Sequence, residues 1–198
     1  MKILRKIIIF SCLVLLVSGC KAFTIANKKV SLLSGKHMVE MSFKNYGKIT
    51  LELDADVAPI TVTNFIDLVI NGFYDGNKIH RVDNDLGVIQ GGQGTGDTIK
   101  GEFLANGVEN DISHVRGVIS MARAGSTTTG YDTASTQFFI TTKDATALDN
   151  YYAAFGKVTK GMDVIDKITK KKFESNEMGS IYNESDMPII EYVKVIEK

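Results

Sequence analysis

The clearest structural pattern in the chain is a pair of short runs, near residue 40 and residue 50, in which apolar and polar residues alternate. Residues 39–44 alternate in this way, and residues 49–54 do so again, with a turn around Gly47 between them. A period of two is typical of a β-strand with one buried face, so this stretch is predicted to form a β-hairpin. Each such strand must bury its apolar face against other strands or a helix.

Further short strands recur through the rest of the chain. They are predicted at Lys78–Val82, Gly87–Gln90, Gly117–Ala122, Gln137–Thr142, Ala153–Val158 and Ile189–Ile196. Only Pro59–Val69 and Gly161–Ile168 have apolar residues at helical spacing, with a proline in the first turn of the former. Many short strands, two helices and no strand–helix alternation predict an antiparallel barrel or sandwich.

Composition limits the classes of protein to which the chain belongs. With 198 residues, of which 44% are hydrophobic, it is long enough for one domain with a substantial core. Its 23 basic and 23 acidic residues cancel, so no nucleic-acid partner is expected. The sequence shows no pattern that indicates an oligomer, and we expect a monomer.

The first twenty residues have the layout of an export signal. Lys2, Arg5 and Lys6 precede an apolar run that ends in Val17-Ser18-Gly19-Cys20. That run is too short to span a bilayer comfortably. Small residues directly before a cysteine resemble the lipobox of bacterial lipoproteins, in which the cysteine is lipidated and becomes the mature N-terminus.

This pattern predicts a lipoprotein signal peptide at residues 1–19 and a lipid-anchored tether at residues 20–38. Acyl chains on Cys20 would hold the protein on the extracytoplasmic face of the bacterial cell membrane. An ordinary cleaved signal, or a leader retained as the anchor, is the alternative. We expect this lysine-containing tether to be a solvated linker. Contact of its lysines with anionic lipid headgroups is the alternative.

Both cysteines of the chain, Cys12 and Cys20, lie in this leader. The predicted folded domain, residues 39–198, therefore has no disulfide, no thiol nucleophile and no cysteine-bound metal. The three histidines of the chain, His37 just before this domain and His80 and His114 within it, are scattered along the sequence. We expect neither a metal nor a cofactor.

An ordered set of short motifs between residues 78 and 156 carries the strongest functional signal. The motifs are K-I-H-R-V, I-Q-G-G, S-M-A-R-A, S-T-Q-F-F-I-T and A-L-D-N-Y-Y-A-A-F-G. In this order they resemble the cyclophilin family of peptidyl-prolyl cis/trans isomerases, over essentially the whole chain from Val39 onward. The resemblance implies a closed eight-stranded antiparallel β-barrel with an α-helix at each open end.

The resemblance also implies a reaction and its site. Rotation about an Xaa-Pro bond meets a barrier of about 18–20 kcal/mol and needs no nucleophile, general base or metal. Arg81 would draw the lone pair of the proline nitrogen out of resonance, and Gln90 would hold the substrate backbone and orient the arginine. The remaining implied substrate contacts are His80, Val88, Ala122, the backbone of Arg123, Gln137, Phe139, Leu148 and Tyr152. Phe138, the neighbour of Phe139 on the same predicted strand, should face away from the site and belong to the core.

The sequence departs from the family pattern near this site. The family usually has an aromatic residue a few positions after the arginine, whereas residues 83–90 contain none. Either Leu86 fills that place or the pocket is open there. Ala147 stands where many eukaryotic members have tryptophan, and the insertion Gly125–Asp132 lengthens a loop beside the pocket.

Catalysis of proline isomerisation in exported proteins has two alternatives from other functional classes. The same groove would serve a chaperone or scaffold module that grips proline-containing polypeptides with little turnover. A hydrolase would need a serine activated by a nearby base, and no nucleophile-elbow motif surrounds any serine. The loop Gly91–Gly96 lacks the Gly-Lys-Ser/Thr ending of a phosphate-binding loop.

Overall fold

The computed structural model describes residues 31–125 and 130–196, and residues from Leu32 onward form one compact unit. The predicted signal peptide, Cys20 and most of the predicted tether lie outside the described residues. Within them, the structure contains no helix whose length and apolar character would suit a bilayer span.

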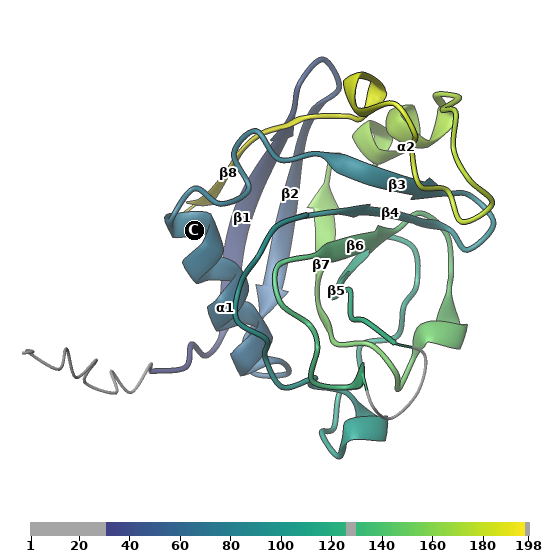
Figure 1. Cartoon of the computed structure of the whole chain (residues 1–198). Helices are drawn as coiled ribbons and strands as arrows, with labels where there is room; N and C mark the ends of the chain where they lie inside the picture. Colours follow the sequence, from purple (N-terminus) through teal and green to yellow (C-terminus); the bar gives the residue numbers. More distant parts are fainter. Residues whose placement is uncertain (1–30, 126–129, 197–198) are drawn as a thin grey trace, which may run out of the picture. The chain divides into compact units, whose positions relative to one another are not determined.

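The structure is mainly β, and its elements lie where the sequence pattern predicts them (Figure 1). The two helices are α1 (Pro59–Ile70) and α2 (Met162–Lys170). The strands are β1 (Lys36–Phe43), β2 (Gly47–Asp54), β3 (Ile79–Asp83), β4 (Val88–Gly91), β5 (Val118–Met121), β6 (Phe138–Thr141), β7 (Ala154–Lys160) and β8 (Ile190–Ile196). Strand β1 begins at Lys36, so it includes the last three residues of the predicted tether.

The expectation of a closed barrel is wrong. The eight strands form one curled antiparallel sheet in the order β3-β4-β6-β5-β7-β2-β1-β8, and β3 and β8 are its two edges. A single isolated bridge, Lys78 to Ile189, joins the edges in place of a ladder. The sheet is therefore an open half-barrel.

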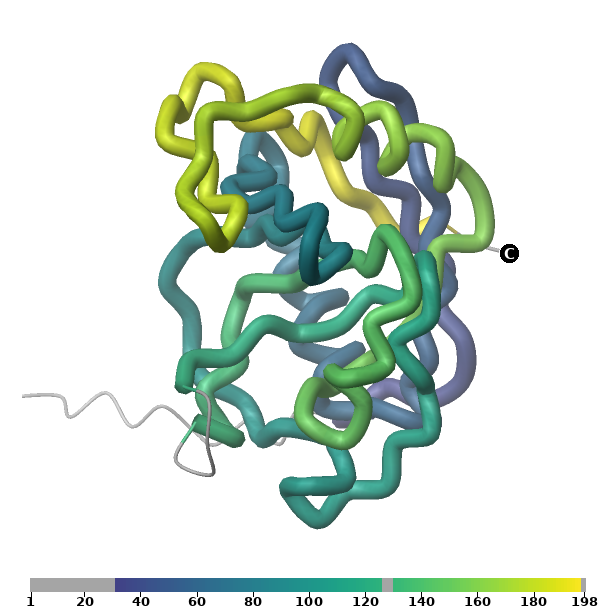
Figure 2. The backbone as a smooth tube through the Cα atoms, turned by 90° about the vertical axis from the view of Figure 1, so that its right-hand side faces the viewer, coloured from purple at the N-terminus to yellow at the C-terminus, as the bar shows by residue number. Residues whose placement is uncertain are grey.

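The segment before β8 explains why the barrel stays open. Its Gly179 carbonyl accepts a hydrogen bond from Val82 at 2.8 Å, and its Ile181 N–H donates to His80 at 2.9 Å. These bonds occupy the outer backbone groups of β3 that β8 would need for a ladder. In Figure 2 this yellow-green segment crosses over the β3–β4 hairpin.

The buried faces of the strands meet the helices in a core rich in aromatic side chains. Helix α1 packs against β8 and β2, and its Phe65 is fully buried. The Phe65 ring lies 5.0 Å from that of Tyr74, 5.9 Å from that of Phe138 and 5.2 Å from that of Phe155. Aromatic pairs at these separations contribute beyond the area they bury. They fix α1 against β6 and β7, strands that also carry or flank the site described below.

A buried carboxylate holds the N-terminus of α1. Glu102 is 2% exposed and accepts hydrogen bonds from the N–H groups of Ile60 at 3.0 Å and Thr61 at 2.8 Å. The first N–H groups of a helix have no partner within the helix, and its positive N-terminal end favours a negative charge. Glu102 therefore caps α1 across a long stretch of sequence.

We predict that Glu102→Ala lowers the free energy of unfolding by about 1–3 kcal/mol, because it leaves one buried and one part-buried N–H group without acceptors. Urea unfolding at pH 7 measures the loss. The exposed Glu109, farther along the same loop, provides the matched control Glu109→Ala, which should change stability by less than about 0.5 kcal/mol. Equal losses in the two variants would contradict the assigned cap.

Candidate active site

The strand register places four residues in one row across the sheet, namely three residues of the predicted site and one serine. Arg81 of β3 lies opposite Gln90 of β4, and Gln90 lies opposite Phe139 of β6. Phe139 in turn lies opposite Ser120 of β5. Residues directly opposite one another on antiparallel strands project to the same face of the sheet. The row therefore gathers a cation, an amide and an aromatic ring on one surface.

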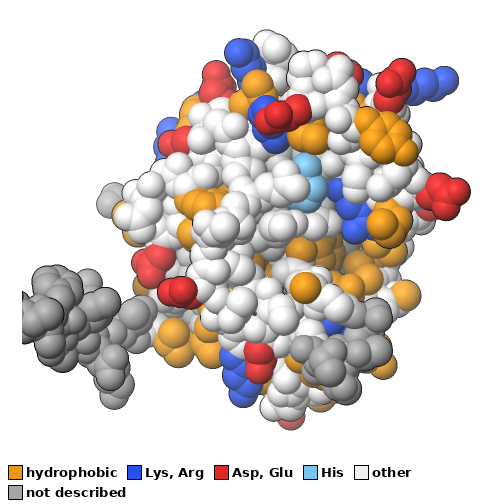
Figure 3. Space-filling model, in the orientation of Figure 1, with side chains coloured by type: hydrophobic (Ala, Val, Ile, Leu, Met, Phe, Trp, Pro, Cys, Tyr) orange, Lys and Arg blue, Asp and Glu red, His pale blue; other side chains and the backbone are white. Residues whose placement is uncertain are grey.

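This surface contains a cavity of about 130 Å³. A cavity of about 150 Å³ is enough to hold benzene, so a five-membered proline ring is of suitable size. Its apolar walls come from Leu86, Val88, Ala122, Phe139, Leu148 and Tyr152, and its polar side comes from Arg81, Gln90 and Arg123. Figure 3 shows hydrophobic side chains gathered to the right of centre on this face, with Lys or Arg atoms beside them. The structure thus brings together eight of the ten residues implied by the motifs.

The guanidinium of Arg81 is held from three directions. Its Nε donates to the Met178 carbonyl at 2.6 Å, its Nη1 to Gln90 Oε1 at 3.2 Å, and its Nη2 to Asp83 Oδ2 at 2.6 Å. These bonds engage three of the five N–H donors of an arginine. The side chain remains 24% exposed and lines the cavity. It is therefore fixed in orientation and retains donor capacity toward a ligand.

A second cavity, of about 210 Å³, adjoins the first. The two share Gln90, Ala122 and Arg123, and the second is also lined by Gln137. Gln90 Nε2 donates to Gln137 Oε1 at 2.9 Å, which extends the polar chain from Arg81 to Gln137. This is where the structure places Gln137, the ninth implied residue.

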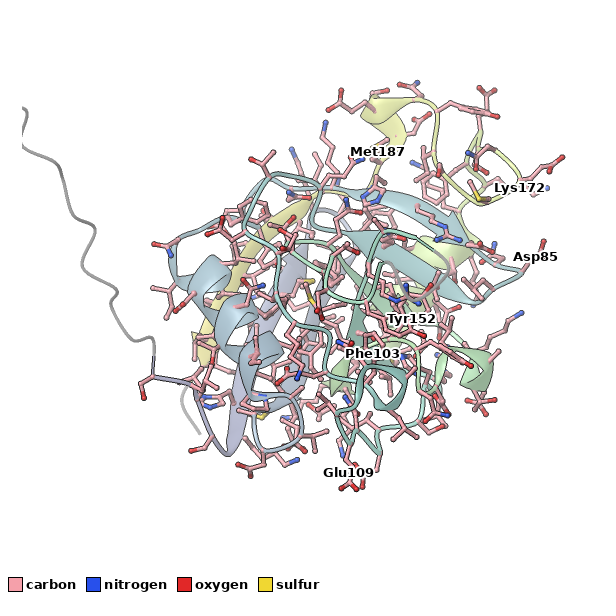
Figure 4. The ribbon with its side chains drawn as sticks, turned by 60° about the horizontal axis from the view of Figure 1, so that its bottom comes forward. Asp85, Phe103, Glu109, Tyr152, Lys172 and Met187 are labelled. Carbon is pink, nitrogen blue, oxygen red and sulfur yellow. The ribbon has the colours of Figure 1, made fainter. Side chains whose placement is uncertain are left out.

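Arg123 has a structural setting that its motif does not reveal. Its guanidinium lies 5.6 Å from the ring centre of Phe103, 5.1 Å from that of Tyr131 and 4.7 Å from that of Tyr152. A cation over an aromatic face is attracted by the ring. Figure 4 labels Phe103 and Tyr152, which lie near each other in the middle of the view. Arg123 therefore packs Tyr152 into the wall of the cavity.

His80 is the implied residue that lines neither cavity. Ile79 lies opposite Gly91 and Arg81 lies opposite Gln90, so His80 is the extra residue of a β-bulge. Its Nδ1 is buried without a hydrogen-bond partner in the structure. Burial chiefly, and then the neighbouring charge of Arg81, lowers the pKa of His80. The bulge shifts the strand register so that Arg81, rather than His80, faces Gln90.

The two glycines after Gln90 permit the close approach that their motif predicts. Gly92 has φ +82°, and a Cβ placed on it would lie 2.5 Å from the Thr136 carbonyl. A Cβ on Gly91 would lie 2.8 Å from Ile79 Cδ1. Side chains here would force β4 away from its neighbours and displace Gln90.

Three groups that the motifs do not mark also shape the site. Asp83 is 9% exposed, binds the Arg81 guanidinium and accepts the Leu86 N–H at 2.7 Å. The Met178 carbonyl approaches from the segment before β8, and Leu86 itself forms part of the apolar wall. Asp83 was detectable in the sequence, because residues two apart on a strand share a face. The position of Met178 depends on a contact across 97 residues and leaves no local signal.

Ser120, His114 and Asp149 form a hydrogen-bonded series with the order of a catalytic serine triad. His114 Nε2 lies 3.1 Å from Ser120 Oγ, and its Nδ1 lies 2.8 Å from Asp149 Oδ1. Ser120 is 0% exposed and His114 is 1% exposed, so a substrate cannot reach the hydroxyl. Because its serine and histidine are buried behind Phe139, the array does not support hydrolysis. Among the residues that the structure describes, no His, Cys, Asp and Glu side chains gather into a metal site.

Comparison with known proteins gives a consistent family. Residues 38–193 match the model of the family described as cyclophilin type peptidyl-prolyl cis-trans isomerase/CLD. Peptidyl-prolyl cis-trans isomerase A of Dickeya dadantii is 40% identical over 77% of this chain and 81% of its own length. A peptidyl-prolyl cis-trans isomerase of Acinetobacter baylyi is 43% identical over 66% of this chain and 71% of its own length.

Solved structures agree with the observed fold. A cyclophilin type peptidyl-prolyl cis-trans isomerase of Cryptosporidium parvum has a TM-score of 0.69 at 23% identity, covering 83% of this chain and 99% of that one. The same protein, solved in the presence of the dipeptide Ala-Pro, has a TM-score of 0.67 at 24% identity, covering 81% and 99%.

We predict that mild acid destabilises the fold through the partly buried His80 and the buried His114. Burial is the main cause that lowers the pKa of both His80 and His114 below 6.5, so the unfolded chain takes up protons first as the pH falls. The free energy of unfolding should therefore decrease between pH 7.5 and 5.5. Urea unfolding across this range measures it, and His80→Gln should reduce the slope. A flat profile, or an unchanged slope in the variant, would contradict the assignment.

Proposed function

The chain belongs to the cyclophilin-type peptidyl-prolyl cis-trans isomerases, and we propose that it rotates Xaa-Pro bonds of exported proteins at the cavity beside Arg81. The observation that carries this proposal is the row across β3, β4 and β6. It sets one fixed guanidinium and one amide at the side of an apolar cavity that is suited in size to a proline ring. The structure solved with Ala-Pro in a related protein supports the choice of ligand class.

The arrangement suits bond rotation because that reaction transfers no atom. The bond is stiffened by donation of the nitrogen lone pair into the carbonyl, with a barrier of about 18–20 kcal/mol. A charged N–H donor aimed at the proline nitrogen favours the twisted state, in which that lone pair is localised. Arg81 has two N–H donors beyond those bound to Met178, Gln90 and Asp83. Since the twisted state accepts such a bond better than the planar one, Arg81 stabilises the transition state selectively.

The other residues hold the substrate. Phe139 is 4% exposed and Val88 is 2% exposed, so the cavity offers a nearly dry apolar wall to the ring. Gln90 and Gln137 are joined by a hydrogen bond and present the remaining amide groups to the substrate backbone. Binding in this way fixes the proline while the preceding carbonyl rotates.

A specific observation also favours a second function, a binding module with little turnover. Leu86 stands in the cavity wall where the family usually has an aromatic ring and is 37% exposed, so this wall offers less apolar surface and is more open to water than an aromatic would make it. The carboxylate of Asp83 also neutralises part of the positive charge of Arg81. Both features reduce the stabilisation available to the twisted state without removing the groove.

We predict that Arg81→Ala reduces catalysed cis/trans exchange by roughly 10²–10³-fold while peptide affinity changes much less. NMR exchange spectroscopy on a short Xaa-Pro peptide measures the rate, and titration of the same peptide measures affinity. Arg116→Ala is the matched control, because Arg116 is a partly exposed arginine paired with Asp166 at 2.8 Å and lies outside both cavities. It should leave exchange unchanged.

The outcomes separate the two functions. Exchange enhancement by the wild type that disappears in Arg81→Ala supports the isomerase. Peptide binding without exchange enhancement in the wild type would instead assign the groove to a binding module. Equal exchange in the wild type and Arg81→Ala would remove Arg81 from the mechanism.

We further propose that the protein is a lipoprotein on the extracytoplasmic face of the bacterial membrane. The support is the sequence of the leader, in which a basic start and an apolar run end in Ser18-Gly19-Cys20. More than one acyl chain at Cys20 would anchor it stably, since a single chain gives only marginal binding. From there it would meet polypeptides as they emerge unfolded from export.

We predict that radiolabelled palmitate is incorporated into the wild type in a bacterial host and is absent from Cys20→Ala. Cys12→Ala is the matched control, because it removes the other leader cysteine and should keep the label. Protease added to cells whose outer envelope has been permeabilised should degrade the wild-type domain. An unlabelled wild type, or equal labelling of Cys20→Ala, would contradict the proposal.

A further inference from the structure

Asp149 binds three hydrogen-bond donors at the edge of the cavity, although it does not line it. Its Oδ1 accepts the His114 backbone N–H at 2.7 Å and lies 2.8 Å from His114 Nδ1. Its Oδ2 accepts the Ser113 hydroxyl at 2.7 Å. Burial alone would raise the pKa of the Asp149 carboxyl, but the bonds from His114 and Ser113 outweigh it and lower that pKa. The carboxylate is therefore ionised and firmly held at neutral pH.

His114 connects this carboxylate to the floor of the cavity. Its ring stacks on Phe139 with centroids 5.8 Å apart and planes 18° apart. The far nitrogen of the ring reaches Ser120 Oγ at 3.1 Å, and Ser120 lies opposite Phe139 in the sheet. Bonds at both ring nitrogens fix the imidazole plane, and that plane supports the Phe139 ring from behind.

The same carboxylate also fixes a wall of the cavity. Leu148 ends the single-turn helix η3 (Thr146–Leu148) and immediately precedes Asp149. A helix of one turn is stabilised by few internal bonds. The Ala145 N–H, at the start of this turn, donates to the His114 carbonyl at 2.8 Å, so both ends of the turn are tied to His114. The positions of Leu148 and Phe139 therefore both depend on His114.

We infer that Asp149 is a positioning residue for the isomerase: acting through His114, it sets the separation between Phe139 and Leu148 that admits a proline ring. This inference rests on the proposed function of the cavity. Because Asp149 supports the apolar walls and makes no bond to Arg81, it affects how tightly the ring is bound rather than how fast the bound peptide rotates. Arg81 is expected to have the opposite profile.

The test is Asp149→Asn, which keeps the shape of the side chain but removes its charge and one acceptor oxygen. Asp144→Asn is the matched control, because Asp144 is an exposed aspartate in the same loop that accepts only the Arg116 N–H, at 2.9 Å. NMR titration measures the affinity for an Xaa-Pro peptide, exchange spectroscopy at saturating peptide measures the bound rate, and ¹³C-labelled phenylalanine reports the Phe139 ring.

Asp149→Asn should weaken peptide affinity by about tenfold, the effect of losing one hydrogen bond to a charged group. The exchange rate at saturation should change by less than about twofold, since the loss is in ground-state and transition-state binding alike. The Phe139 ring signals should shift in Asp149→Asn and stay in place in Asp144→Asn. If Asp149→Asn does not fold, Ser113→Ala removes only the Oδ2 donor and should weaken affinity in the same direction by a smaller factor.

Unchanged affinity with unchanged Phe139 signals would overturn the inference. A fall in the melting temperature alone, with affinity and rate intact, would also overturn it and leave Asp149 a purely structural residue. Failure of the proposed function is distinguishable, because it shows as a wild type that gives no exchange enhancement. In that case the affinity and Phe139 measurements still decide whether Asp149 shapes the cavity.

Discussion

The site depends on the pairing register of β3, β4, β6 and β5. A shift of one residue in β4 would turn Gln90 to the opposite face and bring the buried Ile89 to the cavity, because side chains alternate along a strand. Register is held strongly here, since Ile89 is fully buried and Gly91 and Gly92 leave no space for a displaced neighbour. The aromatic contacts of α1 with Phe138 reinforce it from the core side. The precision of the site therefore derives from the packing of residues that face away from it.

The chain of polar side chains from Asp83 through Arg81 and Gln90 to Gln137 is organised in the absence of substrate. A donor that is already oriented loses little conformational entropy on binding, which is the main advantage of a fixed charged group in a catalytic site. The ion pair with Asp83 has two opposing effects. It orients the guanidinium, and it neutralises part of the positive charge that a ligand in the cavity would otherwise meet. Orientation is the larger effect, because Asp83 binds only one Nη atom and the other donates to Gln90, which lines the same cavity.

Local patterns predicted the elements well and their closure poorly. Alternation in residues 39–54 and helical spacing in residues 59–69 report which face is buried, and this information is contained within each segment. The same principle predicts that Phe138 and Phe139 face opposite ways, and Phe138 lies in the core while Phe139 lines the cavity. The open edge between β3 and β8 is not predictable from local patterns, because it depends on the hydrogen bonds of Gly179 and Ile181, which compete with β8 for β3. Such competition between distant segments has no signature in either segment alone.

The hydrogen-bonded series of Ser120, His114 and Asp149 shows that the same residue types serve catalysis or support according to their surroundings. The same three residue types, with nearly the same hydrogen bonds, form a nucleophile when the serine faces a substrate. Here Phe139 lies between the imidazole and the cavity, and the serine is completely covered. The strong directional bonds that would activate a nucleophile instead fix an aromatic ring. For a reaction that needs no proton transfer, a rigid wall is the more useful product of this array, because the free energy of binding a proline ring depends on close apolar contact over its whole surface.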